Sequence, residues 1–194
     1  GTVTQVAIST GSETLGAPVD ANDVTTKGFG LDICYDSGND KLVAIWFRDS
    51  DVYPMAAVGT VSGTTTTWGT PVVVNSAAAD GQPVIDYSPD DEKVLGIYTL
   101  SSDTYPYGVV GTVSGTTISF GTPTAITSAN SQKPKITYDT TNNQFLVLTM
   151  QGVTALLKVS IGIISGTSVS FTGTITVTDT GGNTIPMGIA WDEN

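Results

Sequence analysis

An eight-residue stretch of the chain, Val-Gly-Thr-Val-Ser-Gly-Thr-Thr, occurs at residues 58–65 and recurs unchanged at residues 110–117, an offset of 52. A weaker third copy, Ile-Gly-Ile-Ile-Ser-Gly-Thr, follows at residues 161–167. An aromatic residue comes shortly after each copy, and Gly-Thr-Pro follows this aromatic in the first two copies. Internal identity of this kind indicates a protein built from repeated structural units.

A ladder of aromatic residues runs in the same register as these copies. Its members are spaced by 52, 51 and 53 residues, and each has an isoleucine two positions earlier. The ladder consists of Tyr35, Tyr87, Tyr138 and Trp191. Because an aromatic side chain that recurs once per unit usually fills the space between units, we expect these four to be buried there rather than to form a platform for sugars.

Each unit reads as four short β-strands. The first strand ends at the ladder aromatic, and a polar turn leads from it to an apolar run at residues 42–47, 94–100 or 145–150. Such a run, bounded by turn residues, is typical of a strand packed on both faces. The third and fourth strands form a hairpin around Ser-Gly-Thr, and the proline of Gly-Thr-Pro suits an edge strand because it donates no ladder hydrogen bond.

Four-stranded units of about 52 residues predict an all-β fold, a β-propeller whose blades are these units. A stacked β-solenoid is the alternative, but its coils are shorter, roughly 20–30 residues. The whole chain is then one repeat domain, with units at approximately 28–80, 81–132 and 133–182 and a fourth unit split between 1–27 and 183–194. We expect a ring that closes with four blades of this chain or through a partner, or a chain that is a piece of a longer propeller.

Composition excludes several classes of function. Lys and Arg number 7 against 18 Asp and Glu, so the net charge is −11. Nucleic-acid affinity depends on neutralising phosphates with Lys and Arg, and anionic membranes attract basic surfaces, so we expect neither partner. The chain has no His and a single cysteine, Cys34, which removes the Ser-His-Asp and Cys-His arrangements and any cysteine-based zinc site. We expect no metal and no cofactor.

The repeated unit, from Val-Gly-Thr-Val-Ser-Gly-Thr-Thr to Phe-Gly-Thr-Pro, resembles the propeller repeats of about 50 residues in phage tail-fibre and extracellular adhesin-like proteins. Its hairpin also has a distant likeness to the Asp-box hairpin of sialidase-type propellers, without the Asp of that box. The resemblance implies a virion or extracellular location, with a cell-surface glycan or other surface proteins as partners.

Enzymatic activity is not expected from this sequence. A sialidase binds the carboxylate of its substrate with a cluster of arginines, and Arg48 is the only arginine. Four aspartates fall in predicted turns, where Asp caps the backbone: Asp36, Asp90, Asp91 and Asp139. Asp86 lies within a predicted strand. A calcium loop at residues 49–51 lacks the glycine and glutamate that an EF-hand type loop needs. Carboxylate-dependent glycoside hydrolysis remains as an alternative.

The loops between the second and third strands carry tyrosine beside aspartate, and the connections between units carry amides. Tyrosine in a loop suits stacking on a sugar, and amides and carboxylates suit its hydroxyl groups. The candidate ligand-binding residues are Tyr53, Tyr105, Tyr107, Asp51, Asp103, Gln82, Asn130 and Gln132. We therefore predict a non-enzymatic module that recognises glycans. The alternatives are ordinary polar loops in a purely structural fibre or assembly component, including a homo-oligomer that completes the split blade.

Overall fold

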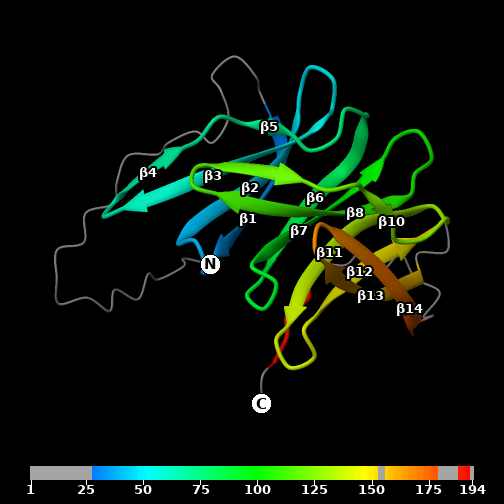
Figure 1. Ribbon diagram of the computed structural model, residues 1–194. Helices are drawn as coiled ribbons and strands as arrows, with labels where there is room; N and C mark the ends of the chain where they lie inside the picture. The colour runs from blue at the N-terminus through cyan, green and yellow to red at the C-terminus, as the bar shows by residue number, and fades with distance from the viewer. Residues whose placement is uncertain (1–27, 153–155, 179–187, 193–194) are drawn as a thin grey trace, which may run out of the picture.

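The computed structural model describes residues 28–152, 156–178 and 188–192, and the regular elements among them are antiparallel β-strands. Three sheets follow one another along the chain and lie side by side in space (Figure 1). The described part of the chain has no helix long and apolar enough to cross a membrane. Of the predicted fourth unit, only residues 188–192 fall within the described residues.

The three sheets share one strand order. The first contains β1 (Gly28–Asp36), β2 (Lys41–Arg48), β3 (Pro54–Ser62), β4 (Thr65–Trp68) and β5 (Val72–Val73). The second contains β6 (Ala79–Ser88), β7 (Lys93–Leu100), β8 (Pro106–Ser114), β9 (Thr117–Phe120) and β10 (Thr124–Ala125). The third contains β11 (Ser131–Asp139), β12 (Gln144–Gln151), β13 (Leu156–Ser165) and β14 (Ser168–Thr178). The predicted four-stranded unit is confirmed in each.

The fourth strand is broken in the first two sheets and continuous in the third. The break falls at Pro71, between β4 and β5, and at Pro123, between β9 and β10. Proline has no N–H to donate to the ladder, so pairing with the third strand is interrupted there. The corresponding residue of the third sheet is Thr174, where β14 continues through a β-bulge instead of breaking. The predicted edge position of the prolines is therefore confirmed.

The core lies between neighbouring sheets and is centred on the second strand of each. Five consecutive residues of β2, from Val43 to Phe47, are buried, and so are Val94 to Tyr98 of β7. One buried cluster joins β2 side chains to Tyr87 of the second sheet, and another joins the second sheet to Tyr138 of the third. The prediction that the second strand is packed on both faces is confirmed.

Two glycines let one sheet touch the next through backbone atoms. A Cβ added to Gly69 would lie 2.0 Å from the carbonyl oxygen of Thr116, and one added to Gly121 would lie 1.9 Å from that of Thr167. Both glycines belong to the repeated Gly-Thr-Pro, and both carbonyls belong to the hairpin of the following sheet. The repeated glycine is thus explained by the close approach of two backbones, which no side chain would permit.

The aromatic ladder is buried in the second and third sheets and exposed in the first. Tyr87 accepts a hydrogen bond from the Gly38 N–H of the preceding sheet at 3.1 Å. The hydroxyl of Tyr138 donates to Asp90, again in the preceding sheet, at 2.7 Å. Tyr35 is about half exposed, and its hydroxyl donates to Asp40 of its own turn at 2.8 Å. Among the described residues, Tyr35 is therefore the exception to the predicted burial, because no described sheet precedes the first one.

Candidate functional site

The first strand of each sheet, which we call the innermost strand, carries a β-bulge at the same place. The register shifts between Phe29 and Asp32 in β1, between Asp80 and Val84 in β6, and between Gln132 and Lys135 in β11. One residue of each bulge has a positive φ angle: Gly30 at 68°, Gly81 at 83° and Lys133 at 53°. A bulge bends its strand and re-aims the neighbouring side chains, and bulges are common beside binding sites.

A hollow of about 180 Å³ lies where these bulges meet. It is lined by Asp32, Gln82, Val84, Lys135, Ile136, Gly188 and Ile189. Positions 32, 84, 135 and 188 are one residue before the four isoleucines of the repeat, so every unit contributes the same register position. The hollow therefore lies on the axis around which the units are arranged. We call it the axial hollow.

Carboxylates beside the axial hollow bind the free N–H groups of the innermost strands. Asp32 accepts the N–H of Ile85 at 2.9 Å. Asp86 accepts the N–H of Tyr87 with one oxygen and that of Tyr138 with the other, both at 2.8 Å. These strands are sheet edges, whose backbone donors need partners. Burial raises the pKa of Asp86, the two N–H bonds oppose this, and the nearby Asp32 carboxylate adds to the increase.

Three polar groups around the axial hollow remain available. Among the described residues, the ammonium of Lys135 and the side-chain amide of Gln82 have no hydrogen-bond or ion-pair partner, and Asp32 uses only one of its two carboxylate oxygens. Val84, Ile136 and Ile189 supply an apolar wall. A concave apolar surface with a few converging polar groups is the usual form of a small-molecule site.

The two predicted loop carboxylates are engaged within their own loops. Asp51 forms a two-pronged ion pair with the Arg48 guanidinium, with the Nε contact at 2.9 Å. This side-chain bond to Arg48 lowers the pKa of Asp51, while partial burial opposes the shift. Asp103 accepts the Tyr105 N–H at 2.9 Å and the Tyr107 hydroxyl at 2.8 Å. These carboxylates shape their loops and leave little free capacity for a ligand.

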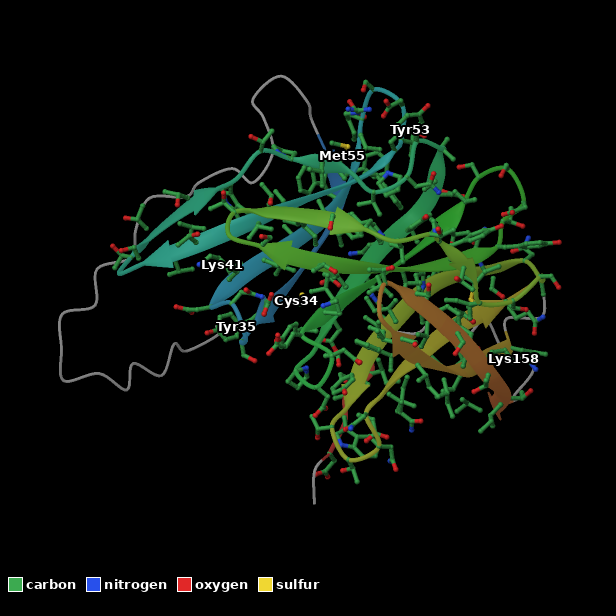
Figure 2. The ribbon with its side chains drawn as sticks, in the orientation of Figure 1. Cys34, Tyr35, Lys41, Tyr53, Met55 and Lys158 are labelled. Atoms are coloured by element: carbon green, nitrogen blue, oxygen red, sulfur yellow. The ribbon has the colours of Figure 1, made fainter. Side chains whose placement is uncertain are left out.

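The predicted loop tyrosines are all half-buried. Tyr53 lies at one end of the first sheet, with Tyr35 at the opposite end (Figure 2), and the Arg48 guanidinium sits 5.6 Å from its ring centre. The Tyr107 ring stacks on Tyr98 at 6.4 Å and 18°. Tyr105 likewise shows only part of its surface. Two of the three rings therefore already face partners within the fold.

The same loops join neighbouring sheets through strained residues. Val52 and Thr104 occupy equivalent positions and have φ angles of 60° and 62°, which β-branched residues rarely adopt. This geometry lets the Val52 carbonyl accept the Ala79 N–H at 3.0 Å and the Thr104 carbonyl accept the Ser131 N–H at 3.1 Å. The strained backbone of these two residues therefore allows the hydrogen bonds that join neighbouring sheets. It also shows that the loops and the connections between units gather at one end, as the sequence predicted.

The predicted amides have different positions. Gln82 lies in the bulge of β6 and lines the axial hollow. Asn130 is exposed, and its carbonyl accepts the Gly152 N–H at 2.8 Å. Gln132 borders the bulge of β11 and is half-buried outside the hollow. Sequence reasoning missed Asp32 and Lys135, although their position one residue before a repeated isoleucine was visible.

Cys34 packs against the core between the first two sheets, as expected for a small core residue. Burial raises the pKa of its thiol well above the usual value, and the carboxylates of Asp86, Asp32 and Asp36 add to the increase. A thiol of this kind is a poor nucleophile because the thiolate is the reactive form. Within the described ranges, no three His, Cys, Asp or Glu side chains converge so as to hold a metal ion.

The buried phenol of Tyr98 makes stability sensitive to alkaline pH. Burial raises its pKa to about 12, and the hydrogen bond from Asn75 opposes this increase. In the unfolded chain, the phenol of this tyrosine ionises near pH 10. The neutral Tyr98 phenol therefore contributes fully to the free energy of unfolding below pH 10, and this contribution falls as the pH rises toward 12. We expect Tyr98→Phe to flatten this part of the stability profile, measured by chemical denaturation from pH 8 to 12. An equally steep fall in the variant would contradict the assignment.

Comparison with known proteins identifies the architecture. No protein-family model and no curated protein sequence matches the chain. An exo-β-1,3-galactanase of Phanerochaete chrysosporium, solved with β-1,3-galactotriose, matches with a TM-score of 0.54 and 10% identity over 78% of this chain and 36% of that one. A second structure of the galactanase gives 0.55 and 9% over the same shares. The three sheets match the blades of this propeller. The chain has a β-propeller fold.

The three sheets are therefore blades, as the repeats predicted. A nidogen–laminin complex also aligns, with a TM-score of 0.48 and 13% identity over 84% of this chain and 52% of that one. This chain spans about a third of the length of the galactanase chains that it matches. At such low identity the likeness concerns the fold, so function has to be argued from the blades' own residues.

Proposed function

We propose that the chain is a non-enzymatic binding module of a virion or extracellular surface, and that it holds one sugar unit of a cell-surface glycan in the axial hollow. The observation that carries the proposal is the convergence of a carboxylate, an amide and an ammonium from the innermost strands of three blades, next to an apolar wall. A sugar offers both kinds of surface, since its C–H faces pack on apolar groups and its hydroxyls bond to charged and amide groups.

The loop end of the blades is a weaker candidate for this site. The carboxylates of Asp51 and Asp103 are occupied by their own loops, and the rings of Tyr53 and Tyr107 face Arg48 and Tyr98. In the axial hollow, by contrast, Lys135 and Gln82 keep their full hydrogen-bonding capacity among the described residues. Free polar groups bind a ligand at lower cost because no internal bond has to break first.

The hydrogen bonds of Asp86 support binding without hydrolysis. Glycoside hydrolysis needs two working carboxyl groups, one to protonate the leaving group and one to act as base or nucleophile. Both oxygens of Asp86 accept backbone N–H groups, so this carboxylate is committed to joining blades. Asp32, which lines the axial hollow, keeps one carboxylate oxygen without a hydrogen bond among the described residues. One available carboxylate suits recognition of a hydroxyl group.

Galactosides are the first saccharides to test, since the galactanases that share the fold were solved with galactose and β-1,3-galactotriose. We expect the chain to bind a glycan on an array. Lys135→Gln and Asp32→Asn should weaken that binding by roughly 10- to 100-fold, because each removes a charge-assisted hydrogen bond. Asp32→Asn still accepts the Ile85 N–H through its amide oxygen, so the blades should stay joined.

The matched control is Lys93→Gln, which removes the same charge from β7 outside the axial hollow. This variant should bind like the wild type, and all three variants should keep the wild-type melting temperature. Undiminished binding by Lys135→Gln and Asp32→Asn would contradict the site. Absence of glycan binding by the wild type would contradict the proposed function and favour a structural role as a spacer or assembly component.

A further inference from the structure

One face of the first blade is apolar and open, whereas the same face of the other blades is covered. Ile33 is 46% exposed, but its counterpart in the second blade, Ile85, is 4% exposed. Val61 is 50% exposed, while the equivalent Val113 and Ile164 are both 8% exposed. In each case the preceding blade does the covering, since Val113 packs in the cluster of the first blade's core and Ile164 in that of the second.

The open face extends along the innermost strand. Leu31 is 57% and Tyr35 54% exposed, against 7% for Tyr87 and 6% for Tyr138 one and two blades later. These four side chains, Leu31, Ile33, Tyr35 and Val61, form what we call the open face. Tyr35 lies in β1, at the end of the first blade that is away from Tyr53 (Figure 2). The apolar side chains of the open face correspond to side chains that are buried in the other blades. This indicates that a neighbour covers the open face.

We infer that the neighbour is the chain's own N-terminal segment, residues 1–27, which docks on the open face as the outer hairpin of a preceding blade. These residues precede β1 directly and lie outside the described residues. They contain Leu15-Gly16-Ala17-Pro18, which aligns with Trp68-Gly69-Thr70-Pro71 at an offset of 53. Gly16 thus corresponds to Gly69, the glycine that lies against the backbone of the following blade.

The junction between blades specifies where Gly16 docks. Gly69 lies against the Thr116 carbonyl, and Gly121 lies against the Thr167 carbonyl, each one blade further on. Moving this contact back by one blade pairs Gly16 with the carbonyl of Thr64, in the hairpin that follows β3 of the first blade. Val61 borders the same hairpin. The glycine and the open face therefore belong to a single docking geometry.

A second copy of the chain fits this surface less well. In a head-to-tail pair, the third blade of one copy would cover the open face of the other. The residue of the third blade at the position of Gly121 is Thr172, which faces Ile161 across the strands as Gly121 faces Val110. A Cβ at this position lies within about 2 Å of a carbonyl in both described junctions. Thr172 therefore blocks that docking, whereas Gly16 permits it.

The test compares the same substitution at two adjacent positions of the full chain, Gly16→Thr and Ala17→Thr. The second variant introduces the residue that the first blade already carries at the equivalent exposed position, Thr70. Hydroxyl-radical labelling read by mass spectrometry reports the exposure of Tyr35, with Tyr138 as the buried reference within the same molecule. Sedimentation measured in parallel reports the oligomeric state.

In the wild-type monomer we expect Tyr35 to be labelled as weakly as Tyr138. Gly16→Thr should raise the labelling of Tyr35 several-fold and lower the melting temperature, while Ala17→Thr should change neither. Strong labelling of Tyr35 in the wild-type monomer would overturn the inference. Protection of Tyr35 that appears only when the chain dimerises would overturn it in favour of a second copy. None of these outcomes depends on whether the axial hollow binds a glycan.

Discussion

Replacing Gly121 by valine is expected to lower the free energy of unfolding by at least about 3 kcal/mol, the upper range for inserting atoms into a packed contact. The new Cβ would lie 1.9 Å from the Thr167 carbonyl oxygen, and this atom belongs to the backbone of the next blade. Neither partner can move aside by rotating a side chain, so the second and third blades must separate. Urea denaturation measures the loss.

Thr172→Val is the matched control for Gly121→Val. It places the same side chain at the same position of the third blade, where the exposed strand residue is already β-branched and pairs with Ile161 beside a β-bulge. We expect it to change the free energy of unfolding by less than about 1 kcal/mol, as for most surface substitutions. Equal losses in both variants would show that Gly121 matters for its strand and not for the junction.

Tyr138→Ala should lower the free energy of unfolding by about 3–5 kcal/mol, as truncation of a large buried aromatic does. The ring is buried between the second and third blades and meets Phe145 edge to face at 4.9 Å. Its hydroxyl also donates to Asp90 of the preceding blade. The alanine variant therefore loses the packing, the ring contact and the bond between blades together.

Tyr138→Phe separates these contributions because it removes only the hydroxyl. We expect it to cost about 1 kcal/mol, the usual net value of one hydrogen bond. Both variants are measured by the same denaturation experiment. If Tyr138→Ala were as stable as the wild type, the aromatic ladder would not hold the blades together. If Tyr138→Phe cost as much as Tyr138→Ala, the bond to Asp90 rather than the packing would dominate.

Much of the fold could be predicted because the same local sequence patterns recur in three units. Apolar runs bounded by turns identified the buried second strands, and the prolines of Gly-Thr-Pro identified the broken edge strands. The polar turns behave as expected too: Asp36 and Asp139 are buried and accept backbone N–H groups of their own turns. These features depend on neighbours within a few residues, so sequence patterns express them directly.

The candidate site was predicted only in part. Of the eight predicted residues, Gln82 alone lines the axial hollow. The loop tyrosines and aspartates were predicted because such groups suit sugars. In the fold they contact other side chains of the chain, such as Arg48 and Tyr98. A sequence shows which polar groups a loop contains. It does not show which of them the folded chain leaves free.

The amino-acid sequence by itself determined the unit, its four strands and the order of the blades, because hydrophobic period, turn residues and proline act locally and recur at a constant offset. Only the tertiary structure decided the site and the open face. Asp32, Val84, Lys135 and Gly188 share one register position but no chemical type, so no motif marks them. The first three meet because three bulged edge strands converge on one axis. Tyr35 differs from Tyr138 only because no described blade precedes it.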